Sequence, residues 1–391
     1  MFVTTRGRSG LSGWEKMRRA YVLATMVTVA LALVATGCST TAKASPPDFA
    51  HMGPYSVGAT TLDLGSTGST LGERLATVFY PADASKLGGH PRFSYDLEAP
   101  LPDALRAIVP PKYDSTIVVD AHVDAPGSTH GPFPIVLFSH GFGASRLYYS
   151  NLLTGIASWG FVVVSADYLE RGLLAQASHP DVASTPAKDL QTMFSSLAAT
   201  EAASANRSSS LYGVANSHKI AAVGHSAGGQ TAFDALKDSR VDVAVGWAPV
   251  GPTGTPSKKP AMIIGALGDI ALTPATLTHE FKTFRGPTKF VEISGEGHDT
   301  YTDICTSIRS GVGGLVGFAE SVHLISPQLA KLANSGCAAK DIAPQRFWPI
   351  VQYYTVAELR SGLGIDRSGA GLGAPSTGQF KGFEITYRQH Q

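Results

Sequence analysis

Short apolar segments recur along the chain from residue 74 onward. The later ones contain four to eight apolar residues without strict alternation, and each is bounded by Gly, Pro or polar turn residues. This pattern is typical of strands that are buried on both faces of a sheet. The predicted strands occupy residues 74–81, 132–140, 160–168, 218–226, 241–249, 260–269 and 288–298.

Segments with helical periodicity separate several of these strands, at residues 147–159, 187–205 and 227–238. Alternation of strand and helix predicts an α/β fold whose mostly parallel sheet carries helices on both faces. The region from Cys305 to about Gly362 is predicted to be helical, and residues 362–378 form a glycine-rich surface segment. In such a sheet, reactive groups gather at the carboxyl ends of the strands.

The first forty residues differ from the rest of the chain. Arg18 and Arg19 precede an apolar run over residues 21–35, which is followed by Cys38. The run is short for a membrane span, which needs roughly 20 residues, and it fits a secretory signal. The small residues before Cys38 resemble a bacterial lipoprotein signal, in which the cysteine is acylated. We therefore expect a signal over 1–38, a tether over 39–50 and one domain over 51–391, with the protein held on the membrane by Cys38. The alternative is a cleaved signal and a secreted protein.

Composition limits the partners of the 391-residue chain. Apolar residues make up 43% of it and the net charge is +1, which predicts a globular protein without a basic surface for nucleic acid. There is no C-x-x-C motif, and the segment HEFKT at His279 lacks the second histidine of a zinc-protease helix. We expect neither a metal nor another cofactor. In an oxidising compartment Cys305 and Cys337 could pair, and two unpaired buried thiols are the alternative.

The sequence GHSAG at residues 224–228 fits the pattern G-x-S-x-G. An apolar strand ends at this motif and a helix begins from it, which is the strand–turn–helix context of a nucleophile elbow. Ser226 is thus the predicted nucleophile, and a purely structural turn is the alternative.

A serine hydroxyl needs a base to take its proton, and the base needs a third group to orient it. Of the 12 histidines, His298 ends a later strand on a turn, and Asp269 ends the strand before it. The order Ser, Asp, His is the one used by this strand–turn–helix arrangement. Asp299 and Glu296 are too near His298 in sequence to face its ring easily, and Asp242 opens a strand.

Hydrolysis through a serine also needs two backbone N–H donors for the developing oxyanion. Ala227, the residue after the nucleophile, is the first candidate. The second is Phe142 in SHGFG, residues 139–143, which follows an apolar strand. An ordinary glycine turn is the alternative for this second segment.

These motifs together resemble the platelet-activating-factor acetylhydrolase family and its bacterial esterase relatives, a branch of the α/β-hydrolases. The resemblance rests on residues 53–62, 135–168, 224–229 and 295–303, and it is loose from residue 305 to 391. It implies a serine esterase that works through an acyl-enzyme, with Ser226, Asp269 and His298 as triad and Phe142 and Ala227 as oxyanion donors.

The leading hypothesis is therefore hydrolysis of short-chain acyl or lipid esters outside the cytoplasm. Polyester depolymerisation, amide or peptide hydrolysis, and a non-catalytic surface-binding lipoprotein are the alternatives. Phe142 and Trp247 are candidate apolar walls for the substrate, although Trp247 could equally belong to the core. The segment 169–187 is either a partial lid or a plain connection.

Overall fold

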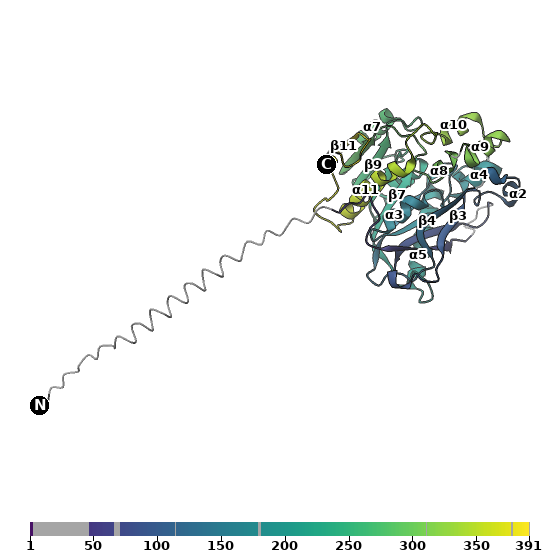
Figure 1. Cartoon of the computed structure of the whole chain (residues 1–391). Helices are drawn as coiled ribbons and strands as arrows, with labels where there is room; N and C mark the ends of the chain where they lie inside the picture. Colours follow the sequence, from purple (N-terminus) through teal and green to yellow (C-terminus); the bar gives the residue numbers. More distant parts are fainter. Residues whose placement is uncertain are drawn as a thin grey trace, which may run out of the picture. The chain divides into compact units, whose positions relative to one another are not determined.

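The computed structural model describes residues 1–2, 47–65, 71–113, 115–178, 181–309, 311–376 and 378–390. The chain divides into two compact units, Met1–Pro46 and Pro47–Gln391. All described helices and strands belong to the second unit (Figure 1). The predicted signal and Cys38 lie outside the described residues. Among the residues that are described, no helix is both long and apolar enough to span a bilayer.

A single eleven-stranded sheet runs through the second unit, in the order β11-β10-β9-β8-β7-β5-β6-β2-β1-β4-β3. The six strands from β6 to β10 in that order pair in parallel, whereas β2, β3 and β11 each pair antiparallel with their neighbours. The strands are β1 (Ser56–Asp63), β2 (Leu75–Ala82), β3 (Arg92–Asp96), β4 (Thr116–Val123), β5 (Phe133–Ser139), β6 (Val162–Ala166), β7 (Ala215–His225), β8 (Val241–Trp247), β9 (Ala261–Ala266), β10 (Thr288–Ile293) and β11 (Ile385–His390).

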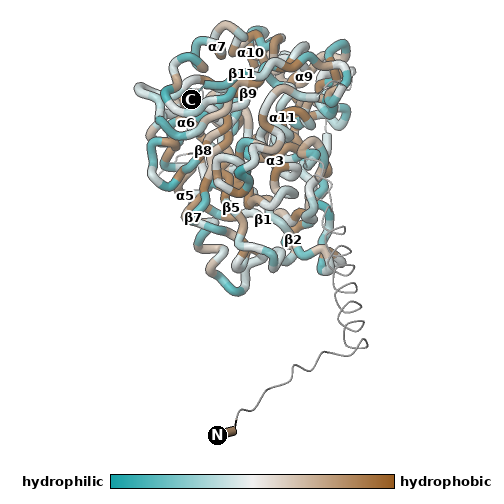
Figure 2. The backbone as a smooth tube through the Cα atoms, turned by 90° about the vertical axis from the view of Figure 1, so that its left-hand side faces the viewer, coloured by the Kyte–Doolittle hydropathy of each residue, from teal (hydrophilic) through white to brown (hydrophobic). Residues whose placement is uncertain are grey.

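Helices cover both faces of this sheet. Helices α3 and α11 pack on one face, and α5, α6 and α7 pack on the other (Figures 1 and 2). The helices are α2 (Asp103–Arg106), α3 (Ser150–Ala157), α4 (Leu173–Ser178), α5 (Pro186–Ala205), α6 (Ala227–Ala235), α7 (Pro274–Thr283), α8 (Ile304–Ile308), α9 (Gly314–Ser321), α10 (Pro327–Ala333) and α11 (Pro344–Gly362), with short 3-10 turns η1 (Ala84–Lys86), η2 (Pro111–Tyr113) and η3 (Leu169–Arg171).

The central strands supply side chains to two separate cores because successive residues of a strand point to opposite faces. In β5, Val136 and Phe138 join the core under α3 and α11, whereas Ile135 and Leu137 join the core under α5 and α6. Figure 2 shows the hydrophobic segments in the interior. Burial on both faces explains why these strands lack alternation in the sequence.

Each predicted strand and helix is present, with ends shifted by a few residues. The hydrophobic pattern did not predict β1, β3, β4, β11, α2, α4 and α7. In β4 buried, half-buried and exposed positions mix, and in β11 every position is half-buried or exposed, so neither strand forms an apolar run. The tether predicted over 39–50 also ends too late. Phe49 is fully buried and packs edge-on against Trp159, with ring centroids 4.8 Å apart, so the folded unit begins before residue 51.

Candidate active site

Ser226 lies in the sharp turn between β7 and α6. Its backbone has φ 55° and ψ −122°, a conformation that residues with a side chain rarely adopt. Three hydrogen bonds hold this turn. The Ser226 N–H donates to Trp247 O at 2.9 Å, and Ser226 O accepts from the N–H groups of Gly229 and Val250, also at 2.9 Å. The serine side chain is thereby presented at the carboxyl end of a central strand.

Two glycines make this turn sterically possible. A Cβ on Gly224 would lie 2.0 Å from Gly228 O, and a Cβ on Gly228 would lie 1.9 Å from Ser139 O. The first approach brings helix α6 against the end of β7. The second brings it against the end of β5, where the SHGFG segment starts. Both glycines of G-x-S-x-G are thus required by close backbone contacts.

The structure brings Ser226, His298 and Asp269 together at the ends of three strands. His298 Nε2 lies 2.9 Å from Ser226 Oγ, and His298 Nδ1 lies 2.7 Å from Asp269 Oδ2. The other carboxylate oxygen of Asp269 accepts from the N–H groups of Ala271 and Leu272, at 2.7 and 2.8 Å. This is the hydrogen-bonded order of nucleophile, base and orienting acid that activation of a serine needs.

The environment of His298 favours a basic imidazole. Burial by itself would lower the pKa of His298, but the hydrogen bond to Asp269 and the charges of Asp299 and Asp269 outweigh it and raise the pKa above the usual value. A stronger base accepts the serine proton more readily. Because Nδ1 faces a carboxylate, that nitrogen carries the proton, and Nε2 is free to accept.

A second histidine, His225, fixes the backbone around this group. Its Nε2 donates to His298 O at 2.9 Å, and its Nδ1 accepts from the Tyr149 hydroxyl at 2.8 Å. The Tyr149 hydroxyl also accepts from the Gly141 N–H at 3.3 Å. Burial, together with the charge of His298, holds the pKa of His225 well below its usual range, so the ring stays neutral. One chain of hydrogen bonds therefore links the SHGFG segment to the His298 loop.

The SHGFG segment lies directly against Ser226. A Cβ on Gly141 would be 3.3 Å from Ser226 Cβ, which places the following residue, Phe142, beside the site. Ala227 is the first residue of α6. Neither the Phe142 N–H nor the Ala227 N–H donates a hydrogen bond to an acceptor within the described residues. Both predicted oxyanion donors are thus near Ser226 and uncommitted.

Buried polar contacts brace this segment from behind. The Gly143 N–H donates to Arg171 O at 2.7 Å, and the Arg171 guanidinium forms a buried ion pair with Asp189. His140 accepts from the Tyr168 N–H through Nε2 at 3.0 Å, so its Nδ1 donates to Gly141 O at 2.8 Å. Burial, reinforced by the charge of Arg171, lowers the pKa of His140 to about 3 and keeps this ring neutral.

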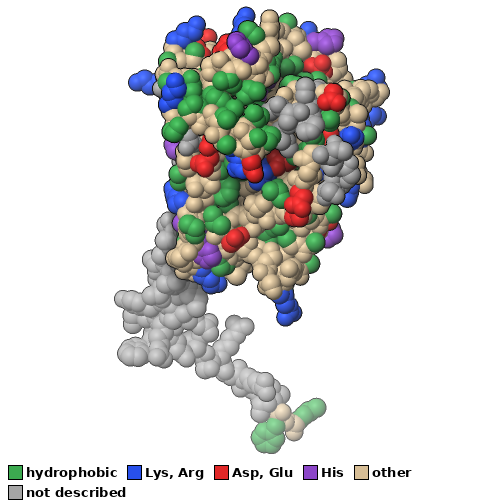
Figure 3. Space-filling view, turned by 90° about the vertical axis from the view of Figure 1, so that its right-hand side faces the viewer, with side chains coloured by type: hydrophobic (Ala, Val, Ile, Leu, Met, Phe, Trp, Pro, Cys, Tyr) green, Lys and Arg blue, Asp and Glu red, His purple; other side chains and the backbone are tan. Residues whose placement is uncertain are grey.

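A cavity of about 150 Å³ opens beside Ser226 and His298. Most of its wall is apolar, and much of that wall comes from the segment 304–333, which includes α8, α9 and α10. On the face shown in Figure 3, hydrophobic side chains gather over the upper part, the end at which Figure 1 places α9 and α10. The wall residues from this segment include Ile304, Leu315, Val316, Phe318, Leu324, Ile325, Leu329 and Leu332.

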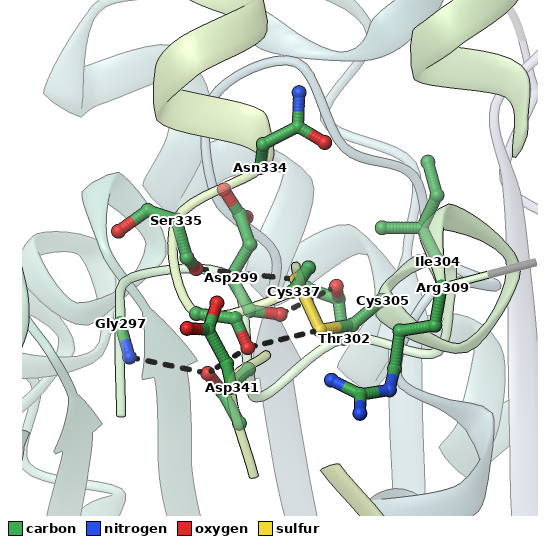
Figure 4. The surroundings of a disulfide bond; sticks show 12 residues. Gly297, Asp299, Thr302, Ile304, Cys305, Arg309, Asn334, Ser335, Cys337 and Asp341 are labelled. Carbon is green, nitrogen blue, oxygen red and sulfur yellow. Dashed lines mark hydrogen bonds between the residues drawn. A yellow bond between two sulfur atoms is a disulfide. The ribbon is translucent and has the colours of Figure 1, made fainter. Parts of the chain in front are cut away.

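A disulfide between Cys305 and Cys337 closes this segment into a loop, with a sequence separation of 32 (Figure 4). Both cysteines are fully buried and pack in one cluster with Val316 and Ala330. Val316 also faces the cavity. The covalent link therefore lies directly behind the apolar wall. We call residues 305–337 the cap.

Two expectations about the substrate wall have different outcomes. Phe142 lines the cavity and is 53% exposed. Trp247 does not line it: the ring is fully buried, donates to Thr355 Oγ1 at 3.0 Å and packs on Phe138 and Tyr301, so the alternative of core packing is the correct one. The segment 169–187 forms η3 and α4 before α5 begins, and it contributes Leu173 and Gln176 to the wall.

None of the three acids that the sequence analysis rejected as partner of His298 forms a hydrogen bond to its ring. Glu296 is buried and accepts from Thr300 Oγ1 at 3.4 Å, and Asp242 lies at the start of β8. Asp299 does line the cavity, although it is not the partner of His298. Sequence reasoning missed the role of the cap and of Tyr149. The only signal for the cap was its pair of cysteines.

Parts of the chain are similar to known proteins. The sequence model of the Chlorophyllase family matches residues 113–260. A platelet-activating factor acetylhydrolase from Cavia porcellus is 30% identical over 129 residues, which is 32% of this chain and 29% of that protein. The chain thus spans less than a third of the length of this curated relative.

Among solved structures, a ferulic acid esterase from Streptomyces cinnamoneus superposes with a TM-score of 0.59 at 20% sequence identity. The superposition covers 88% of this chain and 98% of that one. This likeness and the topology of the sheet confirm the predicted α/β-hydrolase fold. The chain is thus similar to a chlorophyllase family model and to an acetylhydrolase in sequence, and to a ferulic acid esterase in fold.

Proposed function

We propose that this protein is a serine hydrolase of carboxylic esters. The observation that carries the proposal is the hydrogen-bonded series from Ser226 through His298 to Asp269 at the edge of an apolar cavity. The similarity to esterases supports the same reaction class. A surface-binding protein without catalysis would need neither the series nor the uncommitted N–H groups beside it.

In the first step, His298 Nε2 takes the proton of Ser226 as the serine oxygen attacks the ester carbonyl carbon. The tetrahedral intermediate then collapses, the bond to the alcohol oxygen breaks, and His298 returns the proton to that oxygen. In the second step, water attacks the acyl-enzyme, His298 takes a proton from the water, and the proton goes back to Ser226 as the acid leaves. Asp269 holds the imidazole in the required tautomer throughout.

The Phe142 and Ala227 N–H groups are proposed to bind the oxyanion of both intermediates. Because they are backbone groups held by buried contacts, they are oriented before the substrate arrives, and little reorganisation accompanies the reaction. One such donor typically contributes roughly 10²–10³ in kcat. Small changes in the SHGFG segment should therefore have large kinetic effects.

The cavity supports esters whose bound group is apolar and small. Its volume of about 150 Å³ is close to that of a protein cavity that accommodates benzene. Short to medium acyl chains, including those of lipid esters, fit this size. We propose these as the substrates.

We also propose that the enzyme works outside the cytoplasm, attached to the membrane by lipid on Cys38. The signal-like segment over 1–38 supports export, and the buried disulfide suits an oxidising compartment. The test is a Cys38→Ala variant, which should be recovered in the soluble fraction of the culture. Retention of that variant in washed membranes to the same extent as wild type would contradict the anchor.

The reaction is tested with p-nitrophenyl acetate, butyrate and hexanoate, a short-chain phospholipid, an aliphatic amide and an aromatic polyester film. Wild type is compared with Ser226→Ala and with Ser208→Ala, which changes an exposed serine away from the site. We expect turnover of the soluble esters by wild type and Ser208→Ala, and loss of turnover in Ser226→Ala. Equal rates in all three proteins would refute the proposal, and preference for the amide or the film would replace the substrate class.

A further inference from the structure

Asp299 is an acid in the cavity that takes no proton and forms no hydrogen bond in the proposed reaction, although its charge helps to raise the pKa of His298. It follows His298 directly and lines the cavity together with Ser226 and His298. The backbone N–H and C=O groups of Asp299 form hydrogen bonds, but its carboxyl oxygens accept none from any donor within the described residues. Asp299 is partly exposed and faces a mostly apolar cavity, so its carboxyl group depends on solvent or on the occupant of the cavity for hydrogen-bond donors.

Apart from Gln176, whose side chain has no hydrogen-bond partner within the described residues, the neutral polar side chains of the wall are committed to protein partners. The Tyr148 hydroxyl donates to Leu97 O at 2.6 Å, and the Tyr149 hydroxyl is shared with His225. Thr302 Oγ1 donates to Asp299 O at 2.7 Å. The carboxyl group of Asp299 is thus left as a hydrogen-bond acceptor toward whatever occupies the cavity.

The backbone that carries this carboxyl group is held in place by its loop. The Asp299 N–H donates to Ser335 O at 3.0 Å, and the His298 N–H donates to Ser335 Oγ at 3.1 Å. Gly297 and Gly336 approach so closely that a Cβ on Gly297 would lie 2.3 Å from Gly336 N. Figure 4 shows this loop beside the disulfide, with the side chain of Asp299 extending away from the two sulfur atoms.

The electrostatics agree with an acceptor that lacks a partner. Burial raises the pKa of Asp299 to about 7, with a further increase from the charge of Asp269 and a decrease from that of His298. The ionised form is therefore poorly stabilised by the protein alone. A hydroxyl or ammonium group on a ligand would supply the missing donor, and hydrogen bonds to charged groups are among the strong ones.

We propose that Asp299 determines specificity, by selecting esters whose cavity-bound group carries a hydrogen-bond donor, a hydroxyl or an ammonium. This inference rests on the proposed ester hydrolysis and names the substrate class of the same site. Esters that carry a carboxylate on the same group are disfavoured, because two anions would then meet in an apolar cavity. Plain acyl esters are accepted but without this contact.

The test compares kcat/KM of the mature protein for the p-nitrophenyl esters of hexanoate, 3-hydroxyhexanoate, 6-hydroxyhexanoate, 6-ammoniohexanoate and the monoester of adipate. The variants are Asp299→Asn, Asp299→Leu and, as a matched control, Glu320→Gln, which removes an exposed carboxylate from α9 of the same cap. Wild type should prefer at least one donor-bearing ester over hexanoate by about ten-fold, which equals about 1.4 kcal/mol.

Asp299→Leu should remove this preference, and Glu320→Gln should retain it. Asp299→Asn keeps an acceptor oxygen without the charge, so it should retain preference for a hydroxyl but lose discrimination between the ammonium and carboxylate esters. A wild-type ratio near one for every donor, or a preference that survives Asp299→Leu, would overturn the inference while leaving ester hydrolysis intact.

If wild type turns over no ester, the proposed function fails, and the inference is tested by binding alone. Calorimetry then compares hexanamide with 3-hydroxyhexanamide and 6-hydroxyhexanamide on wild type and Asp299→Leu. Tighter binding of a hydroxylated amide, lost in Asp299→Leu, would support the role of Asp299. Equal affinities on both proteins would overturn it.

Discussion

Removal of the disulfide should reveal how much the cap depends on it. We consider Cys305→Ser with Cys337→Ser in a Cys38→Ala background, so that all 3 cysteines of the chain are accounted for. The bridge spans a sequence separation of 32. The entropy of closing a loop of that length in the unfolded chain corresponds to about 3.7 kcal/mol at 25 °C. For a folded unit of roughly 345 residues, this lowers the melting temperature by about 5 °C.

The same change should alter the cavity. Val316 and Ala330 pack on the two cysteines, and Val316 is part of the cavity wall. Once the link is gone, the wall holds a longer acyl chain less firmly. The gain from burying methylenes, at most about 0.8 kcal/mol each, should therefore shrink. We expect the ratio of kcat/KM for hexanoate over acetate to fall, with the acetate value nearly unchanged.

The assays are urea denaturation followed by far-UV circular dichroism, thermal melting, and initial rates on the two p-nitrophenyl esters. The control is the Cys38→Ala parent with the disulfide intact. A loss of free energy of unfolding below about 1 kcal/mol, well short of the loop-closure value, would show that the bridge does not restrain the unfolded chain. An unchanged hexanoate-to-acetate ratio would show that the wall is held by packing alone.

Three further changes test the site itself. Gly228→Ala places a Cβ 1.9 Å from Ser139 O. We expect a loss of about 1–3 kcal/mol in the free energy of unfolding and a large fall in kcat. The control is Gly88→Ala, whose added Cβ meets no neighbour. Asp269→Asn should lower kcat by roughly 10⁴. His298 must be neutral to accept the serine proton, and its pKa is raised, so activity should fall as the pH drops through a midpoint above 6.5. Because Asp269 helps to raise that pKa, a pH profile of Asp269→Asn should show the midpoint at lower pH. Tyr149→Phe leaves the Gly141 N–H and His225 Nδ1 without their shared hydrogen-bond partner. An unsatisfied buried polar group costs about 1–3 kcal/mol. Steady-state kinetics should therefore show kcat reduced by about ten-fold and KM changed little.

The groups brought together at Ser226 could be predicted because each ends an apolar strand. A parallel sheet places the ends of β7, β9 and β10 on one edge, so a strand-terminal Ser, Asp and His must come near each other. The central strands were predictable for the same reason, since burial on both faces leaves unbroken apolar runs. The positions of Gly224 and Gly228 follow from the motif.

The cavity wall could not be predicted in this way. Its members come from places as far apart in the chain as Leu101, Phe142, Leu173 and the cap. Apolar side chains at such positions look the same in sequence whether they face a core or a cavity. Trp247 illustrates this point, because it ends a strand on the catalytic side and still turns its ring into the core.

The backbone of Ser226 has a thermodynamic consequence of its own. Its φ of 55° with ψ of −122° is a conformation that glycine adopts readily, whereas a residue with a Cβ pays about 1–3 kcal/mol in steric strain. The strain is thus located at the residue proposed as the nucleophile. Ser226→Gly should release part of this strain and melt at a higher temperature than Ser226→Ala, and we expect both variants to be inactive. On the proposed mechanism, this strain is a loss of stability that accompanies the reactive conformation of the serine.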